Sequence, residues 1–139
     1  MPIWILYGLL SALFAALVAI FGKIGLQNID STLATTIRSV VMAGFLVLAS
    51  LSIGKFSHWN ELDGRIMCFI VLSGVAGALS WLFYFFALKA GPANGVVALD
   101  RTSVIFVIIL AALFLGEGLT WKTILGGILI AVGAILLVV

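Results

Sequence analysis

The chain has 139 residues, of which 65% are hydrophobic and only 9% are charged, whereas soluble domains carry about 25% charged residues. A mean hydropathy of +1.40 excludes an ordinary soluble globule, a disordered chain and a fibrous repeat. The formal net charge of +2 is too small to suggest a nucleic-acid partner, and the single Cys68 permits no internal disulfide.

Apolar runs of about 20 residues, the length that crosses a bilayer, follow one another along the chain. They lack the alternation of an outer-membrane barrel. The first run, residues 3–21, is uncharged, ends near Lys23 and lacks the basic leader of a secretory signal, so we predict a retained span. The second, residues 32–53, has Asp30 available as an amino-terminal cap and is interrupted only by Arg38.

The third run, residues 66–88, contains no charged residue. Residues 91–92 that follow it are Gly-Pro, a pair that ends one helix and starts another. The fourth run, residues 93–115, is closed by the Gly-Glu-Gly turn of residues 116–118.

The fifth run continues to Val139, with Thr120 as its predicted cap. Five spans of about 20 residues use about 100 of the 139 and leave only short connections. We therefore predict an all-α membrane protein that lies in the lipid bilayer, with a single domain, residues 1–139, of five transmembrane helices.

The longest connection, residues 54–64, holds His58, Glu61 and Asp63. One histidine and two acids on a loop rarely complete a metal shell, so a solvated loop is the favoured interpretation and no metal is predicted. The chain has no Ser-His-Asp set, no phosphate-cradling glycine loop and no cysteine pair. Neither an enzyme nor a bound cofactor is expected.

Basic residues are nearly balanced between the two membrane faces. We call the face that carries the N-terminus side A. Side A then has three basic residues, Lys55, Arg65 and Lys122. Side B has two, Lys23 and Lys89, or four if the intramembrane Arg38 and Arg101 are counted. Because the imbalance of Lys and Arg sets orientation, we hypothesise dual topology. The chain shows no internal repeat, so an inverted second half would be another molecule, either an antiparallel copy or a related chain.

Three charged residues lie well inside the predicted spans, away from their ends. Arg38 and Asp100 both lie roughly 10 Å below the side B surface, and a lone charge at that depth is costly, so we predict an ion pair between them. The adjacent Arg101 points about 100° away and is left without that partner. Two interpretations stay open, a packing salt bridge with a snorkelling Arg101, or a substrate site.

Aromatic side chains follow a small-residue stretch in the third span. Trp81, Tyr84 and Phe85 are spaced by three and four residues, which places them along one helix face. Trp81 is too deep for an interfacial belt, so Trp81 and Tyr84 are candidate cavity walls that stack on planar or cationic solutes. Buried aromatic packing is the alternative.

The fifth span carries a small-residue groove in the run LGGILIAVGAILLVV. Spacings of four and seven suit close helix contact, either within the chain or across a dimer. We place Gly126, Gly127 and Gly133 at a predicted dimer interface.

Several segments together resemble the EamA-type module of the drug/metabolite transporter superfamily. They are FGKIGLQNIDSTLATTIRS (21–39), ALKAG (87–91), VVALDRTSVIF (96–106), FLGEGLTW (114–121) and LGGILIAVGAILL (125–137). The resemblance implies export or exchange of small metabolites through a cavity between two modules of opposite orientation, of which this chain looks like one, as in the short bacterial and archaeal members. The resemblance also implies that five residues are motif positions of the family: Arg38, Lys89, Asp100, Arg101 and Glu117. We interpret Glu117 as a connection or interface residue.

We therefore expect a multi-pass inner-membrane transporter of small organic metabolites or drugs that works as a dimer by alternating access. The side B basic residues favour solutes with a carboxylate or phosphate. One alternative is a small multidrug resistance-like exporter of cationic drugs, which the five helices and the acid-free first span oppose. Another is a non-transporting membrane subunit or assembly factor. The candidate substrate-binding residues are Arg38, Trp81, Tyr84, Asp100 and Arg101.

Overall fold

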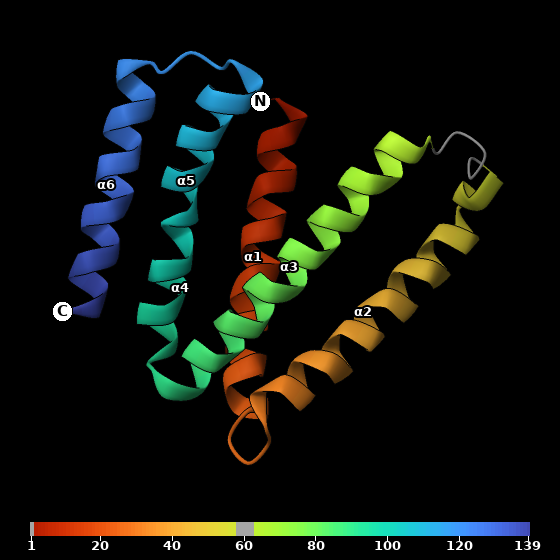
Figure 1. The fold of residues 1–139 in the computed structure, drawn as a ribbon. Helices are drawn as coiled ribbons and strands as arrows, with labels where there is room; N and C mark the ends of the chain where they lie inside the picture. The colour runs from red at the N-terminus through yellow and green to blue at the C-terminus, as the bar shows by residue number, and fades with distance from the viewer. Residues whose placement is uncertain (1, 58–62) are drawn as a thin grey trace. The chain divides into compact units, whose positions relative to one another are not determined.

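A computed structural model describes residues 2–57 and 63–139. Within these residues five helical stretches are long and apolar enough to cross a membrane, which confirms the predicted architecture. The elements are α1 (Ile3–Gly25), α2 (Ser31–Ser52), α3 (Gly64–Ala90), α4 (Ala93–Arg101), α5 (Ser103–Leu110), the π-helical turn η2 (Ala111–Leu115) and α6 (Trp121–Val138) (Figure 1). His58 and Glu61, considered above for a metal site, lie outside the described residues.

Two helices begin at the predicted capping side chains. The Asp30 carboxylate accepts hydrogen bonds from the Thr32 and Leu33 amides, at 2.9 and 3.0 Å, and so starts α2. The Thr120 hydroxyl accepts from the Thr123 amide at 3.2 Å and starts α6. These side chains satisfy amides that the first helical turn leaves without an internal partner.

The fourth span stops at the predicted glycine turn. Gly116 has a φ of +66°, a left-handed conformation that glycine adopts without a steric cost. The following Glu117 amide turns back to donate to the carbonyl of Ala111 at 3.3 Å. At the other end of this span, Pro92 occupies the residue before α4 in extended conformation, as the Gly-Pro pair predicts.

Two helices are longer than the uncharged apolar runs from which they are predicted. α1 continues past residue 21 through Lys23 to Gly25, and α3 includes Arg65 and Lys89 within its ends. Long basic side chains tolerate such positions because their stems lie along apolar surface while the charged group reaches polar atoms. The Lys23 ammonium does this by donating to the Gly91 carbonyl at 2.8 Å.

The fourth span is helical over the predicted residues, Ala93–Leu115, and contains a tighter turn at Thr102. The Thr102 amide and hydroxyl both donate to the Leu99 carbonyl, at 3.0 and 2.6 Å. The Ile105 amide in turn donates to the Thr102 carbonyl at 2.9 Å. Because a threonine hydroxyl competes for the helical carbonyl, it tightens the turn and separates α4 from α5.

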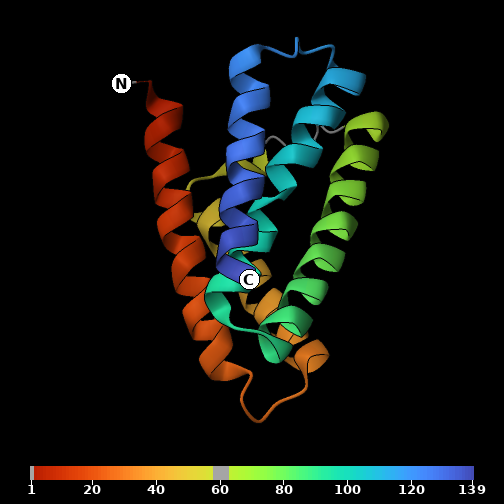
Figure 2. The ribbon, with the colours of Figure 1, turned by 90° about the vertical axis from the view of Figure 1, so that its left-hand side faces the viewer.

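The described chain forms two compact units, Met1–Lys23 with Ala90–Val139, and Ile24–Lys89. In the first, which we call the α1/α4–α6 unit, α6 packs antiparallel on α4 and α5 (Figures 1 and 2). Gly95 of α4 packs directly on α6, since a Cβ there would lie at an ordinary contact distance of 3.7 Å from both the Leu137 carbonyl oxygen and Val138. Small residues that let backbones approach are a usual means of helix association in lipid.

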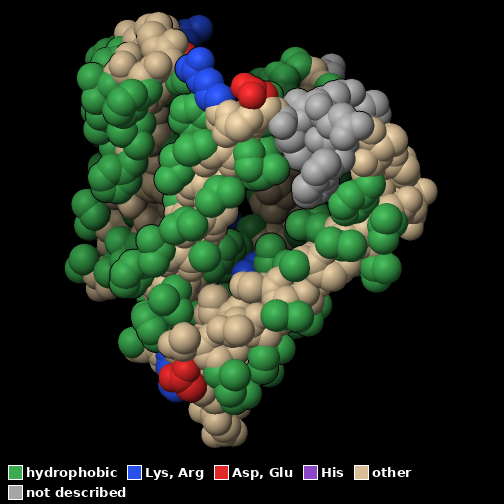
Figure 3. Space-filling view, turned by 45° about the vertical axis from the view of Figure 1, so that its right-hand side comes forward, with side chains coloured by type: hydrophobic (Ala, Val, Ile, Leu, Met, Phe, Trp, Pro, Cys, Tyr) green, Lys and Arg blue, Asp and Glu red, His purple; other side chains and the backbone are tan. Residues whose placement is uncertain are grey.

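The second, the α2–α3 unit, is an antiparallel helix pair (Figure 1). The Lys89 ammonium near the end of α3 donates to the Ile29 carbonyl just before α2, at 2.8 Å, and closes one end of the pair. Figure 3 shows a face covered largely by hydrophobic side chains, with acidic side chains beside basic ones near its upper and lower edges. Such a surface is suited to contact with lipid acyl chains.

Candidate functional site

Arg38 is the central charged residue of the α2–α3 unit. It lies eight residues after the Asp30 cap, about 12 Å along the α2 axis, and is half-buried. Its guanidinium carbon lies 3.6 Å from the centroid of the Trp81 ring and 5.6 Å from that of Phe85, both in α3. This cation–π contact partly compensates a charge that is otherwise costly at membrane depth.

The aromatic residues of α3 form the cluster that their spacing predicts. Trp81 meets Tyr84 and Phe85 edge-on, with ring centroids 5.3 and 6.2 Å apart, and Tyr84 and Phe85 are separated by 6.1 Å. Phe85 is buried, whereas Trp81 and Tyr84 are half-buried. The neighbouring rings fix the orientation of Trp81, and its face is available to the guanidinium.

The ion pair predicted for Arg38 and Asp100 stays a prediction. Arg38 belongs to the α2–α3 unit and Asp100 to the α1/α4–α6 unit. Asp100 and Arg101 form the last turn of α4, directly before the tighter turn at Thr102; Asp100 is half-buried and Arg101 exposed. The structure therefore brings together Arg38, Trp81 and Tyr84 from the predicted set.

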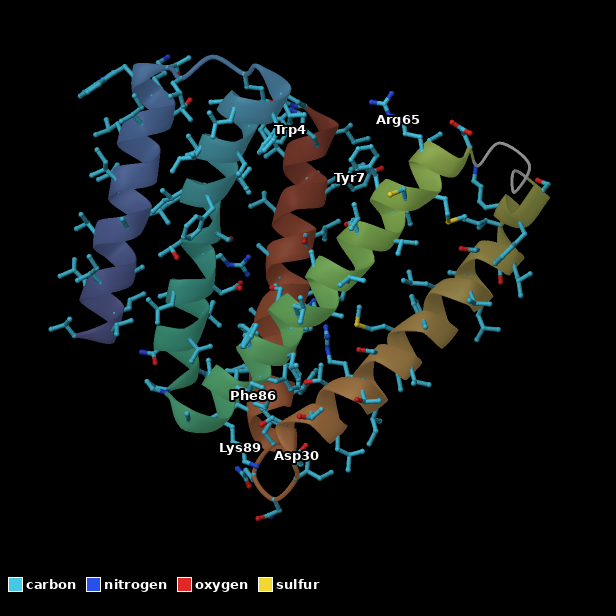
Figure 4. The ribbon with its side chains drawn as sticks, viewed as in Figure 1. Trp4, Tyr7, Asp30, Arg65, Phe86 and Lys89 are labelled. Atoms are coloured by element: carbon cyan, nitrogen blue, oxygen red, sulfur yellow. The ribbon has the colours of Figure 1, made fainter. Side chains whose placement is uncertain are left out.

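Two basic residues of the predicted anion-attracting group have partners in the chain itself. Lys23 and Lys89 each donate to a connection carbonyl, of Gly91 and Ile29 respectively, at 2.8 Å. Figure 4 shows Lys89 near Asp30 at one end of the α2–α3 unit and Arg65 at the opposite end of α3. These lysines tie connections to helix ends, a known role for basic residues in the last turn.

The carboxylate at this end is stabilised in its charged form. The Leu33 amide hydrogen bond lowers the pKa of Asp30 below its ordinary value, with a smaller contribution from the Lys89 charge. A helix amino terminus favours an anion for the same reason, because its amides point toward it. Asp30 is thus a structural cap rather than a counter-ion for Arg38.

The predicted interface glycines of α6 differ in their surroundings. A Cβ at Gly127 would lie 3.4 Å from Ile108 of α5, so this buried position faces the same chain. Beside it, Ile105, Gly127 and Ala131 line part of an apolar cavity of about 360 Å³. At Gly126 and Gly133 a Cβ would meet no described atom within 4 Å, which leaves these two positions available to a second molecule.

The contact between Arg38 and Trp81 was missed at the sequence level, although a signal for it exists. Arg38 follows Asp30 by eight residues, and Trp81 precedes Lys89 by the same number. In an antiparallel pair whose ends meet at Asp30 and Lys89, equal offsets place the two side chains at one depth. Which faces of the helices meet is not encoded in that spacing.

Comparison with known proteins assigns the chain to a family. The model of the EamA-like transporter family matches residues 2–139. An uncharacterized transporter from the cobO 3′ region of Sinorhizobium sp is 45% identical over 136 residues, covering 98% of this chain and 96% of that protein. An uncharacterized protein of Methanocaldococcus jannaschii is 28% identical over 135 residues, covering 96% and 94%. No solved structure matches the chain. The protein is therefore a multi-pass membrane protein that belongs to the EamA-like transporter family.

Proposed function

We propose that this protein moves small organic metabolites or drugs across a membrane by alternating access, as a pair of five-helix modules. Membership of a transporter family, a relative named as a transporter and five membrane spans support the proposal. The observation that carries it is Arg38, a half-buried cation about 12 Å inside a span and stacked on Trp81. Ionisable residues at such depth commonly mark a solute pathway.

Each unit contributes candidate solute-binding residues to the proposal. Arg38, Trp81 and Tyr84 of the α2–α3 unit contribute a cation and an aromatic wall. Asp100 and Arg101 of the α1/α4–α6 unit contribute charges beside the tighter turn at Thr102.

The transport unit requires a second module. Residues 1–139 act as one five-helix module, and two inverted copies would supply the pseudo-symmetry on which alternating access is based. We place this pair in the inner membrane as an antiparallel homodimer, with Gly126 and Gly133 at the contact because a Cβ there has open space. A related half-transporter chain is the other partner that would complete the unit.

Flux through purified protein in liposomes tests the function. Counterflow should be measured for a panel of organic acids, phosphate esters, amines and neutral metabolites. Arg38→Lys should leave folded protein and abolish transport, since lysine lacks the planar fork and stacks poorly. Arg65→Lys, at an exposed position in the same unit, is the matched control and should transport normally. Loss of Arg38→Lys protein from the membrane would instead favour a packing role.

Topology reporters test the antiparallel pair. Paired reporters that work only inside or only outside the cytoplasm are fused after Val139. Activity from both supports dual insertion. Activity from one alone contradicts the homodimer and directs the search to an oppositely oriented partner chain. Absence of flux together with copurification of one larger protein would indicate a membrane subunit rather than a transporter.

A further inference from the structure

We propose that Arg38, held against the ring face of Trp81, binds the carboxylate or phosphate group of the transported solute. The inference rests on the proposed transport function and deepens it, because it names the chemical class that this site selects. It gives Trp81 the role of a positioning residue that acts through Arg38.

The stack leaves the hydrogen-bonding edge of the guanidinium available. A distance of 3.6 Å between the guanidinium carbon and the Trp81 ring centroid permits a roughly parallel arrangement. An edge-on arrangement would push a guanidinium nitrogen inside van der Waals contact with the ring. All five N–H donors of arginine lie in the guanidinium plane, so a face contact uses none of them. The ring also offers no lone pair to accept them.

The described carboxylates of the α2–α3 unit do not reach this edge. Asp30 lies about 12 Å from Arg38 along the helix axis, and its oxygen is engaged by the Thr32 and Leu33 amides. Asp63 precedes α3, eighteen residues and about 27 Å from Trp81, and accepts from its neighbouring Gly64 amide. Within the described part of this unit, the chain supplies Arg38 with aromatic faces and no carboxylate.

The other described cations of the unit are placed at its ends. Lys89 is engaged by the Ile29 carbonyl, Lys55 follows α2, and Arg65 begins α3. Arg38 is the described cation of this unit that lies about two turns inside a helix, whereas Arg65 and Lys89 lie in the end turns of α3. At such a depth low dielectric strengthens a charged hydrogen bond. A carboxylate or phosphate presents two oxygens to the guanidinium fork, which is the geometry that arginine binds best.

The same contact disfavours cationic solutes. Trp81 is the ring face that a planar or quaternary cation would seek, and Arg38 already covers it. A cation entering the site would both displace Arg38 and meet its charge. The occupied aromatic wall therefore supports selection of anions over cations of the same shape.

Fluorescence of Trp81 reports on the site independently of transport. In a Trp4→Phe, Trp59→Phe, Trp121→Phe background, Trp81 is the remaining tryptophan. The purified protein in detergent is titrated with benzoate, phenylphosphonate and benzamidinium; benzoate and benzamidinium are planar and alike in shape but opposite in charge. A saturable change with the two anions and none with benzamidinium is expected. No response to either anion, or a response to benzamidinium alone, overturns the proposal.

Substitutions at Arg38 identify the group that binds. Arg38→Lys should weaken benzoate binding by at least about tenfold because the bidentate fork is lost. Arg38→Gln should abolish it and admit benzamidinium to the emptied Trp81 face. Arg65→Gln, which also removes an arginine of this unit, should bind benzoate as the parent does. Helicity and elution volume identify any variant that fails to fold. If Arg38→Gln does not fold, the benzoate titration of Arg38→Lys tests the proposal. Unchanged benzoate affinity in Arg38→Lys refutes it.

The two proposals fail in different ways. Benzoate binding that depends on Arg38, without solute flux from liposomes, would leave the anion site standing and overturn transport. Flux that is equal in the parent and in folded Arg38→Lys would leave transport standing and overturn the anion site.

Discussion

The two units differ in the contacts that hold their helices together. In the α1/α4–α6 unit, α4 meets α6 at Gly95, where backbone and small side chains touch. The α2–α3 unit also buries apolar side chains, Leu26, Phe85 and Leu88, and adds a lysine on a carbonyl and an arginine on a tryptophan ring. Because lipid gives apolar helices little reason to associate, close packing is a structural solution, whereas an intramembrane cation is costly without a further purpose. The difference between the units is therefore the charged contact of Arg38, which the α2–α3 unit carries in addition to its apolar packing.

The largest effect is expected from bulk at the close contact of the first unit. Gly95→Leu would drive a side chain into Pro92 and the Leu137 carbonyl and should destabilise the fold by about 2 kcal/mol. Resistance to unfolding by SDS, followed by circular dichroism, measures this loss. Gly44→Leu in α2 is the control, since a Cβ there meets no described atom within 4 Å. Equal losses in both variants would remove the distinction between the units.

The next effect concerns the aromatic support of Arg38. Trp81→Leu should raise the KM for an anionic solute by about tenfold, as expected for a cation–π contact of 1–2 kcal/mol. Vmax and protein yield should change little, and Trp81→Phe should restore most of the affinity because the ring face is kept. A fall in yield with no rescue by phenylalanine would mean that Trp81 serves packing alone.

A smaller effect is expected where α6 offers open glycines. Gly126→Leu and Gly133→Leu should lower the dimer fraction, measured by cross-linking in liposomes, while the resistance of the monomer to unfolding is kept. Gly44→Leu again controls for added bulk. An unchanged dimer in Gly133→Leu would exclude α6 from the proposed interface.

The smallest effect is a dependence of stability on pH at the α2 cap. Since the pKa of Asp30 is lowered in the folded state, its contribution is present above the unfolded value of about 3.9 and is lost as pH falls through the folded pKa. Asp30→Asn keeps a capping oxygen and should remove this loss of stability at low pH, measured as the free energy of unfolding against pH. Asp30→Ala removes the cap at every pH. If both variants still lose stability at low pH, another titrating group must be responsible.

Local rules made much of the fold predictable. Spans follow from runs of apolar residues, and their ends follow from Asp30, Gly116 and Thr120, which act within one helical turn of themselves. The differences from the prediction have local causes as well. Lys23 marks the predicted end of the first span but lies inside α1. The fourth span has its predicted bounds, but Thr102 tightens one turn within it by donating back to Leu99.

The sequence by itself determined the membrane setting, the five spans, their caps and the family resemblance, because those properties depend on composition and on neighbours in the chain. Only the tertiary structure decided that Arg38 lies on Trp81, that Lys89 serves the Ile29 carbonyl, and that Gly127 faces Ile108. Each of these contacts joins residues distant in sequence and depends on the rotation of one helix against another. That rotation is fixed by how side chains of different helices pack together, which no single helix specifies.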